Sequence, residues 1–217
     1  MDGGHTVNFE YVDLAHWARQ EHYYHYLSHV PCTYSMTTKL DVTPILQAGY
    51  KIYPAMLYCL AKTVNRHTEF RMDHDADGRL GYYKEMYPCY TIFHKDTETF
   101  SNLWTEYIDD YTLFEQRYRQ DLERYGNVKS MQAKPDTPAN TFPVSMVPWE
   151  NFDGFNLNLE KGYQYLLPIF TMGKYVMVEG RYEMPLSIQV HHAVCDGFHV
   201  CRFLSDLRSV IREFYKG

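Results

Sequence analysis

The chain has 217 residues, of which 45% are hydrophobic, and a formal net charge of -6 at pH 7. A chain of this length can bury a real core, so we expect one domain spanning residues 1–217. No stripe of Lys and Arg and no run of about 20 apolar residues occurs, which excludes a nucleic-acid binder and a transmembrane helix. The first residues lack the basic and apolar segments of a signal peptide, which favours the cytoplasm.

The first half of the chain predicts alternating helices and strands. Residues 11–26 are polar and aromatic with helical character, and the Thr-rich, alternating segment 32–40 is typical of a strand. Residues 54–66 carry apolar side chains at helical spacing. Asp77 and Gly78 together predict the turn of a β-hairpin.

The middle of the chain predicts a short strand at 90–94 and a charged helix at 108–125 with apolar residues along one side. A loop with two prolines follows at 126–139. Three further strands are expected, at 144–146, 156–159 and 169–172.

The end of the chain gives the clearest pattern. Apolar and polar residues alternate along 182–190, which predicts a strand, and an amphipathic helix is expected over 203–214. Strands that alternate with helices on one face predict an α/β fold, a two-layer sandwich with a large mixed sheet.

Cysteine usage points away from structural cross-links. The five cysteines are irregularly spaced and form no CxxC pair, which argues against a disulfide framework and against a zinc site. The 21 tyrosines suit pockets and subunit interfaces, although a tyrosine at the rim of the core explains any single one of them equally well.

The segment 191–197, with the sequence HHAVCDG, lies between the last predicted strand and the last helix. A histidine held between two such elements can act as a general base, because its pKa lies near neutrality. The same spacing also fits a pair of buried structural histidines, or a metal site that still needs a third ligand. Spacing alone leaves these three interpretations open.

The residues around this segment narrow the choice. The string IQVHHAVCDGFHVCRF over 188–203 resembles the signature of trimeric chloramphenicol acetyltransferases that use a catalytic histidine. The resemblance extends over most of the chain, through these segments: VPCTYSMT (30–37), YPAMLY (53–58), TIFHKDTETFS (91–101), VPWENFDGFNLN (147–158) and PIFTMGKY (168–175). It implies the CoA-dependent acyltransferase fold, acetyl-CoA as co-substrate and no metal.

The resemblance implies direct transfer of an acetyl group to the 3-hydroxyl of chloramphenicol within a ternary complex. His192 is the implied base, with its other ring nitrogen bonded to its own carbonyl oxygen, and His191 is implied to be structural. Ser145 would donate to the oxyanion of the tetrahedral intermediate, and Thr171 would hold a water beside it. Asp196 is implied to pair with Arg19 and hold the loop rather than move a proton.

The resemblance also implies which residues bind the two substrates. The expected acceptor pocket contains Tyr26, Val30, Tyr34, Phe100, Phe155, Leu157 and Ile169. The expected acetyl-CoA channel contains Tyr53, Trp149 and Tyr175, with Lys51 and Lys174 near its phosphates. On pattern alone, each residue of the acceptor set would be assigned to the core.

Three features depart from the family pattern: Pro143, Asn102 and the loop 126–139, which lacks an aromatic residue that some relatives place over the drug. They bear on the choice of acceptor rather than on the reaction. The implied assembly is a homotrimer in which His192 of one copy faces a pocket of its neighbour. Two alternatives remain open: an acyltransferase of the same fold with another hydroxylated acceptor, and a non-catalytic trimer that sequesters the drug.

Overall fold

The computed structural model describes residues 9–159 and 164–216. Its main element is a seven-stranded mixed sheet in the order β2-β10-β8-β7-β5-β6, with β9 paired to β10. The strands of this sheet are β2 (Thr33–Asp41), β5 (Tyr87–His94), β6 (Thr99–Trp104), β7 (Thr141–Val147), β8 (Ile169–Gly173), β9 (Val176–Val178) and β10 (Arg181–His191). The strand β7 runs parallel to β5 and β8, whereas β10 is antiparallel to β2 and β8, so the predicted mixed sheet is confirmed.

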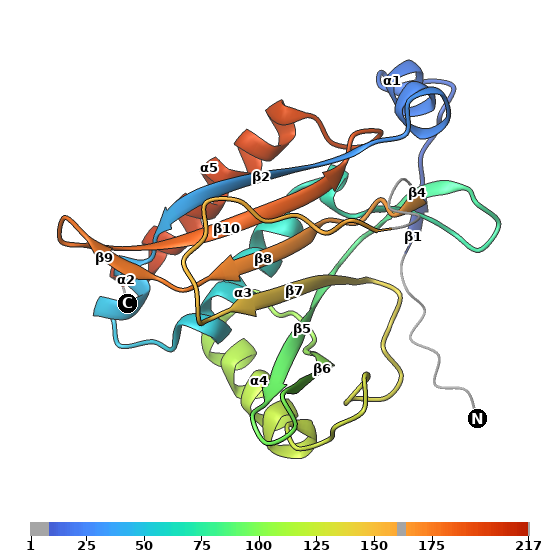
Figure 1. The fold of residues 1–217 in the computed structure, drawn as a ribbon. Helices are drawn as coiled ribbons and strands as arrows, with labels where there is room; N and C mark the ends of the chain where they lie inside the picture. The colour runs from blue at the N-terminus through green and yellow to red at the C-terminus, as the bar shows by residue number, and fades with distance from the viewer. Residues whose placement is uncertain (1–8, 160–163, 217) are drawn as a thin grey trace.

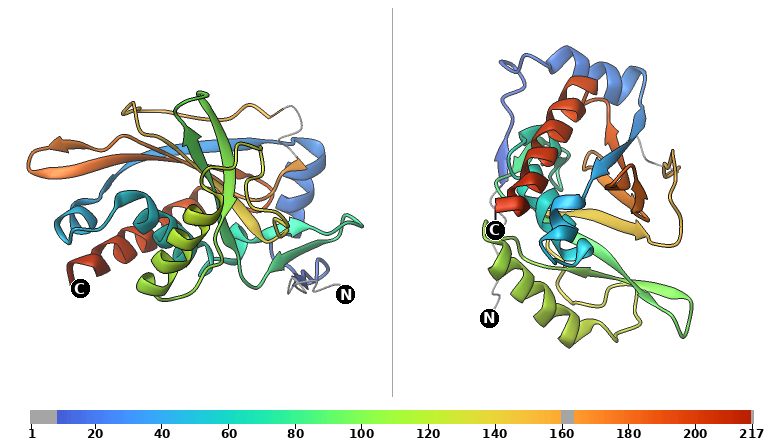
Figure 2. Two further views of the ribbon diagram at one scale, coloured as in Figure 1. Left: turned by 90° about the horizontal axis from the view of Figure 1, so that it is seen from below. Right: turned by 90° about the vertical axis from the view of Figure 1, so that its left-hand side faces the viewer.

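Helices cover one face of this sheet, as the two views of Figure 2 show. They are α2 (Thr43–Gln47), α3 (Ile52–Val64), α4 (Tyr111–Tyr125) and α5 (Gly197–Glu213), with a short 3-10 turn at Phe214–Lys216. Buried apolar side chains of α3 and α5 pack onto the sheet, and Phe203 stacks between Phe70 and Phe170. The expected two-layer α/β sandwich is therefore confirmed.

A smaller antiparallel sheet lies at one end of the molecule (Figure 1). It contains β1 (Phe9–Tyr11), β3 (Met72–His74) and β4 (Leu80–Tyr83). The pairing of β3 with β4 confirms the hairpin predicted at Asp77 and Gly78. The Gly78 backbone has a φ of +76°, a conformation that glycine adopts without strain. The 3-10 turn Thr68–Phe70 leads into this hairpin.

The predicted helix over 11–26 is wrong in its first half. Residues 9–11 pair with β4, and the helix α1 spans only Gln20–Tyr24 before it passes into a π-helical turn at His25–His29. The side chain of Asp13 accepts a hydrogen bond from the Ala15 backbone at 3.2 Å. This local bond favours a turn over a helix.

The strand predicted at 156–159 is also wrong, because this segment forms no backbone ladder with the residues that the structure describes. It runs across the sheet face opposite the helices, in front of β10 in Figure 1. Side chains of β10 bind it instead. The Gln189 amide accepts from Leu157 N at 2.8 Å and donates to Leu157 O at 3.0 Å, and the Ser187 hydroxyl donates to Phe155 O at 2.5 Å.

The other predicted elements are confirmed, with the last helix beginning six residues earlier than expected, at Gly197. The sequence pattern does not predict strands β6 and β9 or the short helix α2. Among the residues that the structure describes, no helix is both long and apolar enough to cross a lipid bilayer.

Candidate active site

A pocket of about 510 Å³ opens at the point where two parallel strands separate. Strands β5 and β7 pair from Tyr87 and Thr141 as far as Tyr90 and Val144, and no further. The pocket walls are formed by the residues that follow on both strands and by side chains of α3 and α4. The lining residues are Tyr53, Thr91, Ile92, Phe93, Glu98, Thr99, Phe100, Tyr118, Leu122, Ser145, Met146, Pro148 and Trp149.

Two hydroxyl side chains meet at the floor of this region. Ser145 on β7 lies opposite Thr171 on β8 in the parallel register, and their hydroxyl oxygens are 3.0 Å apart. Thr171 is 2% exposed, whereas Ser145 lines the pocket. The structure thus brings the two residues expected at the oxyanion side by side.

His192 lies at the opposite end of the sheet, in the turn after β10. The Tyr26 ring lies parallel to its imidazole at a centroid distance of 3.8 Å, and the Tyr34 ring meets it edge-on at 5.3 Å. The His192 backbone N–H donates to the carbonyl of Cys32 at 3.1 Å, which joins the turn to the start of β2. These contacts fix the orientation of the ring.

The expected bond between the imidazole and its own carbonyl is wrong. His192 Nδ1 is buried and has no hydrogen-bond partner among the described residues. The carbonyl oxygen instead accepts from Nη2 of Arg19 at 3.4 Å. Since Nδ1 is enclosed, Nε2 is the ring nitrogen available to a substrate.

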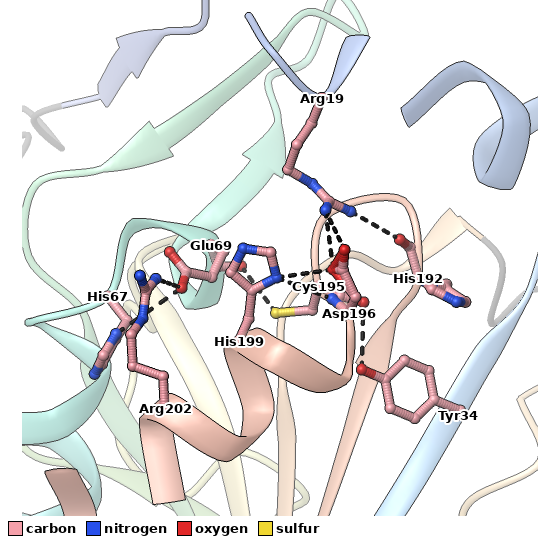
Figure 3. A network of polar contacts seen from close by, with 9 residues as sticks. All are labelled: Arg19, Tyr34, His67, Glu69, His192, Cys195, Asp196, His199 and Arg202. Atoms are coloured by element: carbon pink, nitrogen blue, oxygen red, sulfur yellow. Dashed lines mark hydrogen bonds and ion pairs between the residues drawn. The ribbon is translucent and has the colours of Figure 1, made fainter. Parts of the chain in front are cut away.

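Arg19 and Asp196 form the predicted ion pair (Figure 3). Nη1 of Arg19 lies 2.9 Å from Oδ1 and 2.5 Å from Oδ2 of Asp196. Burial by itself raises the pKa of the Asp196 carboxyl, but the hydrogen bonds and charges of Arg19 and His199 outweigh burial and hold it below its usual value. The His192 ring points away from this carboxylate, so the two residues are not arranged as a catalytic pair.

Asp196 also begins the last helix. It occupies the N-cap position of α5, and its carboxylate lies 2.9 Å from Nδ1 of His199 in the first turn. Asp196 and Gly197 therefore form the start of a helix. The turn that follows β10 lies before them, at residues 192–194. Arg19 therefore connects the N-terminal segment to helix α5 through Asp196. It connects the same segment to the turn through the His192 carbonyl.

Contacts of His191 and Cys195, on either side of His192 in the sequence, also stabilise this turn. His191 is fully buried, and its Nδ1 accepts from the Ala193 N–H at 3.1 Å. The Cys195 carbonyl accepts from the Tyr34 hydroxyl at 3.4 Å, and its thiol contacts the Glu69 carbonyl at 3.8 Å. Glu69 is in turn paired with Arg202 on α5 (Figure 3).

His192 and Ser145 are far apart within one chain. Ser145, Thr171 and Ser187 lie in a row across β7, β8 and β10. His192 lies five residues beyond Ser187, roughly 16 Å further along the strand direction at about 3.3 Å per residue. A single copy of the chain therefore does not bring the expected base to the pocket that holds the expected oxyanion donor.

The residues expected to bind the acceptor fall into two groups for the same reason. Tyr26 and Tyr34 contact His192, and Val30, which is 51% exposed, follows the π-helical turn that contains Tyr26. The other group lies on the pocket side or on the open sheet face: Phe100, Phe155, Leu157 and Ile169. Phe100 is 49% exposed at the pocket, and Ile169 is buried opposite Gln189.

Two of the residues expected to bind acetyl-CoA line the pocket. These are Tyr53, on the first turn of α3, and Trp149, which is 61% exposed. Lys51 is exposed at the N-cap of α3, two residues before Tyr53. Lys174 is exposed, and its backbone donates to the carbonyl of Glu150. Tyr175 does not line the pocket and instead packs edge-on against Tyr182.

The departures from the family pattern have structural consequences. Pro143 has no N–H to donate, and the pairing of β7 with β8 begins one residue later, at Val144. Asn102 uses its backbone N–H and C=O to bind Met131 and Ala133 at 2.8 and 2.9 Å. These bonds fasten the loop 126–139 along the edge of β6.

Gln189 and Ser187 are the functional candidates that the sequence analysis missed. They alternate with Leu186, Ile188 and Val190 on a strand that is buried on both faces. A buried strand with polar residues on one face signals that something polar covers that face. Here the cover is the backbone of Phe155 and Leu157.

Within residues 9–159 and 164–216, no group of three or more His, Cys, Asp or Glu side chains is placed to hold a metal ion. The site as described is built from hydroxyls, one imidazole and aromatic rings.

Comparison with known proteins agrees with this geometry. The family model described as chloramphenicol acetyltransferase matches residues 7–208. A chloramphenicol acetyltransferase of Vibrio anguillarum is 60% identical over 207 residues, which cover 95% of this chain and 96% of that protein. One from Campylobacter coli is 55% identical, covering 95% of this chain and all of that protein.

Solved structures show the same fold at lower identity. A chloramphenicol acetyltransferase structure superposes with a TM-score of 0.79 at 23% identity, covering 95% of this chain and 99% of that one. The dihydrolipoamide acetyltransferase of Azotobacter vinelandii superposes with a TM-score of 0.66 at 15% identity, covering 88% and 86%. These structures place the chain in the CoA-dependent acyltransferase fold, as predicted.

Proposed function

Because the chain belongs to the chloramphenicol acetyltransferase family, we propose that it transfers the acetyl group of acetyl-CoA to the 3-hydroxyl of chloramphenicol. Acetylation inactivates the antibiotic, so the protein confers chloramphenicol resistance. The observation that carries this proposal is the pocket between β5 and β7, which holds the Ser145 hydroxyl on one wall and apolar and aromatic side chains on the others.

In the proposed reaction, Nε2 of His192 removes the proton from the acceptor hydroxyl. The freed oxygen attacks the thioester carbonyl and gives a tetrahedral oxyanion, to which Ser145 donates a hydrogen bond while Thr171 holds a water. The C–S bond then breaks, the CoA sulfur leaves with the proton returned from the imidazolium, and the acetyl ester remains on the acceptor. No acyl-enzyme forms.

The proposed active unit is a homotrimer with its sites between copies. Within one chain His192 lies two strands away from Ser145 and roughly 16 Å further along the strand direction. A neighbouring copy that supplies its His192 to this pocket completes the site, and closed cyclic symmetry repeats the contact three times. The extended segment around Leu157 and Leu159, 41% and 44% exposed, is a surface that such a neighbour could cover.

Acetyl-CoA is a cytoplasmic metabolite, so the proposed reaction places the enzyme in the cytoplasm. Lys51 and Lys174 are exposed and free to meet the phosphates of this co-substrate, beside Tyr53 and Trp149 respectively. Tyr175 follows Lys174 and would extend the same channel. The chemistry as proposed uses no metal, and one domain spanning residues 1–217 carries it.

The direct test mixes the pure protein with acetyl-CoA and chloramphenicol and follows the release of free thiol. Rapid release that depends on the drug is the expected result. Thiol release with another hydroxylated acceptor but not with chloramphenicol would reassign the acceptor. Drug binding without any thiol release would show a sequestering protein instead of an enzyme.

A further inference from the structure

The Tyr53 hydroxyl bonds a strand carbonyl that would ordinarily pair with the N–H of a neighbouring strand. It donates to the backbone carbonyl of Thr91 at 3.0 Å. Thr91 is the first residue of β5 beyond the last pair with β7, where the pocket begins. The bond therefore lies at the point where the sheet separates.

The backbone pattern shows which way the Thr91 carbonyl points. Tyr87 donates to Asn140, the residue before β7, so every second residue from Tyr87 onward directs its backbone polar groups towards β7. Thr91 belongs to this set. Its partner on β6, Asn102, confirms the direction, because Asn102 uses both of its backbone groups to bind residues 131 and 133.

A continued ladder would give the Thr91 carbonyl a different donor. The paired register ends at Tyr90 and Val144, and alternate residues of β7 face β5, so the next donor on β7 after Val144 is the N–H of Met146. Met146 lines the pocket beyond the last paired residues, and the Thr91 carbonyl accepts from the Tyr53 hydroxyl there. If the hydrogen-bond ladder between β5 and β7 continued past Val144, the two strands would stay paired and the pocket beside Ser145 would be narrower.

We propose that Tyr53 is a positioning residue whose hydroxyl holds β5 and β7 apart, and thereby sets the place of Ser145 in the pocket. Its ring is held by α3 and by an edge-on contact with Tyr90 at 5.9 Å. Burial raises the pKa of Tyr53, so the hydroxyl keeps the proton that it donates. This inference rests on the proposed function for Ser145 and assigns Tyr53 a role beyond contact with the co-substrate.

The test compares Tyr53→Phe with Tyr90→Phe. Tyr90 is a buried neighbour whose hydroxyl forms a hydrogen bond with the Thr105 hydroxyl at 2.9 Å, and neither residue lines the pocket. Both variants keep the aromatic ring and lose one hydroxyl bond. Amide hydrogen exchange at Met146 is expected to slow by about tenfold or more in Tyr53→Phe, because this N–H then bonds Thr91, and to stay unchanged in Tyr90→Phe.

Kinetics supply the second readout. Tyr53→Phe is expected to lower kcat by about 10- to 100-fold through the displaced Ser145, with no further loss when combined with Ser145→Ala. An unchanged Met146 exchange rate, or a kcat loss that adds to that of Ser145→Ala, would overturn the proposal. Because the exchange measurement needs no turnover, it stays decisive even if the wild-type protein fails to acetylate chloramphenicol, which would refute only the proposed function.

Discussion

Arg19 and Asp196, separated by 177 residues in the sequence, are joined by an ion pair in which Nη1 lies 2.9 and 2.5 Å from the two carboxylate oxygens. The Arg19 side chain is 17% exposed and that of Asp196 is 35% exposed. Arg19 also reaches the carbonyl of His192, so the pair holds the turn that carries the proposed base.

A double-mutant cycle tests whether this pair acts on stability. Arg19→Met and Asp196→Asn are each expected to lower the free energy of unfolding by about 1–3 kcal/mol, less than for a fully buried pair because Asp196 is partly exposed. The double variant should lose less than the sum, since each single variant leaves one charge without its partner. Unfolding in urea measures all four proteins. Strictly additive losses would show that the two charges do not interact.

The same pair predicts a pH dependence. The pKa of Asp196 in the folded protein lies below its usual value of 3.8. Its contribution to stability is therefore full above that usual value and is lost as the pH falls through the lower, folded value. The stability difference between wild type and Asp196→Asn should thus be constant from about pH 7 to about pH 5 and shrink towards about pH 3. A difference that grew on acidification would contradict this assignment.

Ser145→Ala should affect the chemical step more than binding. In the proposed reaction the hydroxyl donates to the oxyanion, so kcat is expected to fall by about 10²-fold with the KM for chloramphenicol little changed. Steady-state kinetics with both substrates varied distinguishes the two parameters. A change confined to KM would reassign Ser145 to substrate binding.

Gln189 should control the acceptor side of the site. Its amide holds the backbone of Leu157 by two hydrogen bonds, and Leu157 is one of the residues proposed to contact chloramphenicol. Gln189→Leu is expected to raise the KM for chloramphenicol by about tenfold, the effect of losing about 1.4 kcal/mol of binding, and to leave the KM for acetyl-CoA unchanged.

Ser35→Ala is the matched control for Gln189. The Ser35 hydroxyl donates to the same amide oxygen at 3.3 Å, so its bond is to the Gln189 side chain and not to the backbone of Leu157. This variant should keep both KM values. Equal effects of Gln189→Leu on the two KM values would indicate a general loss of packing rather than a role in acceptor binding.

Much of the architecture follows from local pattern. Alternation along 182–190 and helical spacing at 54–66 give β10 and α3 directly, because a side chain period of two or of 3.6 reflects which face is buried. The helix predicted from residue 11 failed because one side-chain bond from Asp13 is enough to favour a turn. The alternation of polar and apolar residues at 156–159 was misleading. The backbone of this segment bonds a side chain of β10 instead of a neighbouring strand, and a periodic pattern does not show which group a backbone will bond.

The candidate site was harder to predict from residues alone. The HHxxxDG spacing left base, metal and structural roles open, and resemblance to a family chose among them. That Ser145 meets Thr171 depends on the register of two parallel strands separated by a long connection, which no local signal encodes. The separation of His192 from Ser145 is likewise a property of strand order, visible only once the sheet is assembled.

In the proposed trimer the active site is shared between copies, and His192 of one chain serves the Ser145 pocket of another. His192→Ala and Ser145→Ala, each purified alone, should be strongly impaired. Co-expressed with two different tags and purified through both, they should form mixed trimers in which about a third of the sites, one in each trimer, combine an intact His192 with an intact Ser145.

Thiol release by these mixed trimers is the decisive measurement. A site shared between copies should give chloramphenicol-dependent activity at about a third of the wild-type rate per site, far above that of either variant alone. Mixed trimers no more active than the two separate variants would contradict it, because a site built within one chain cannot be restored by mixing.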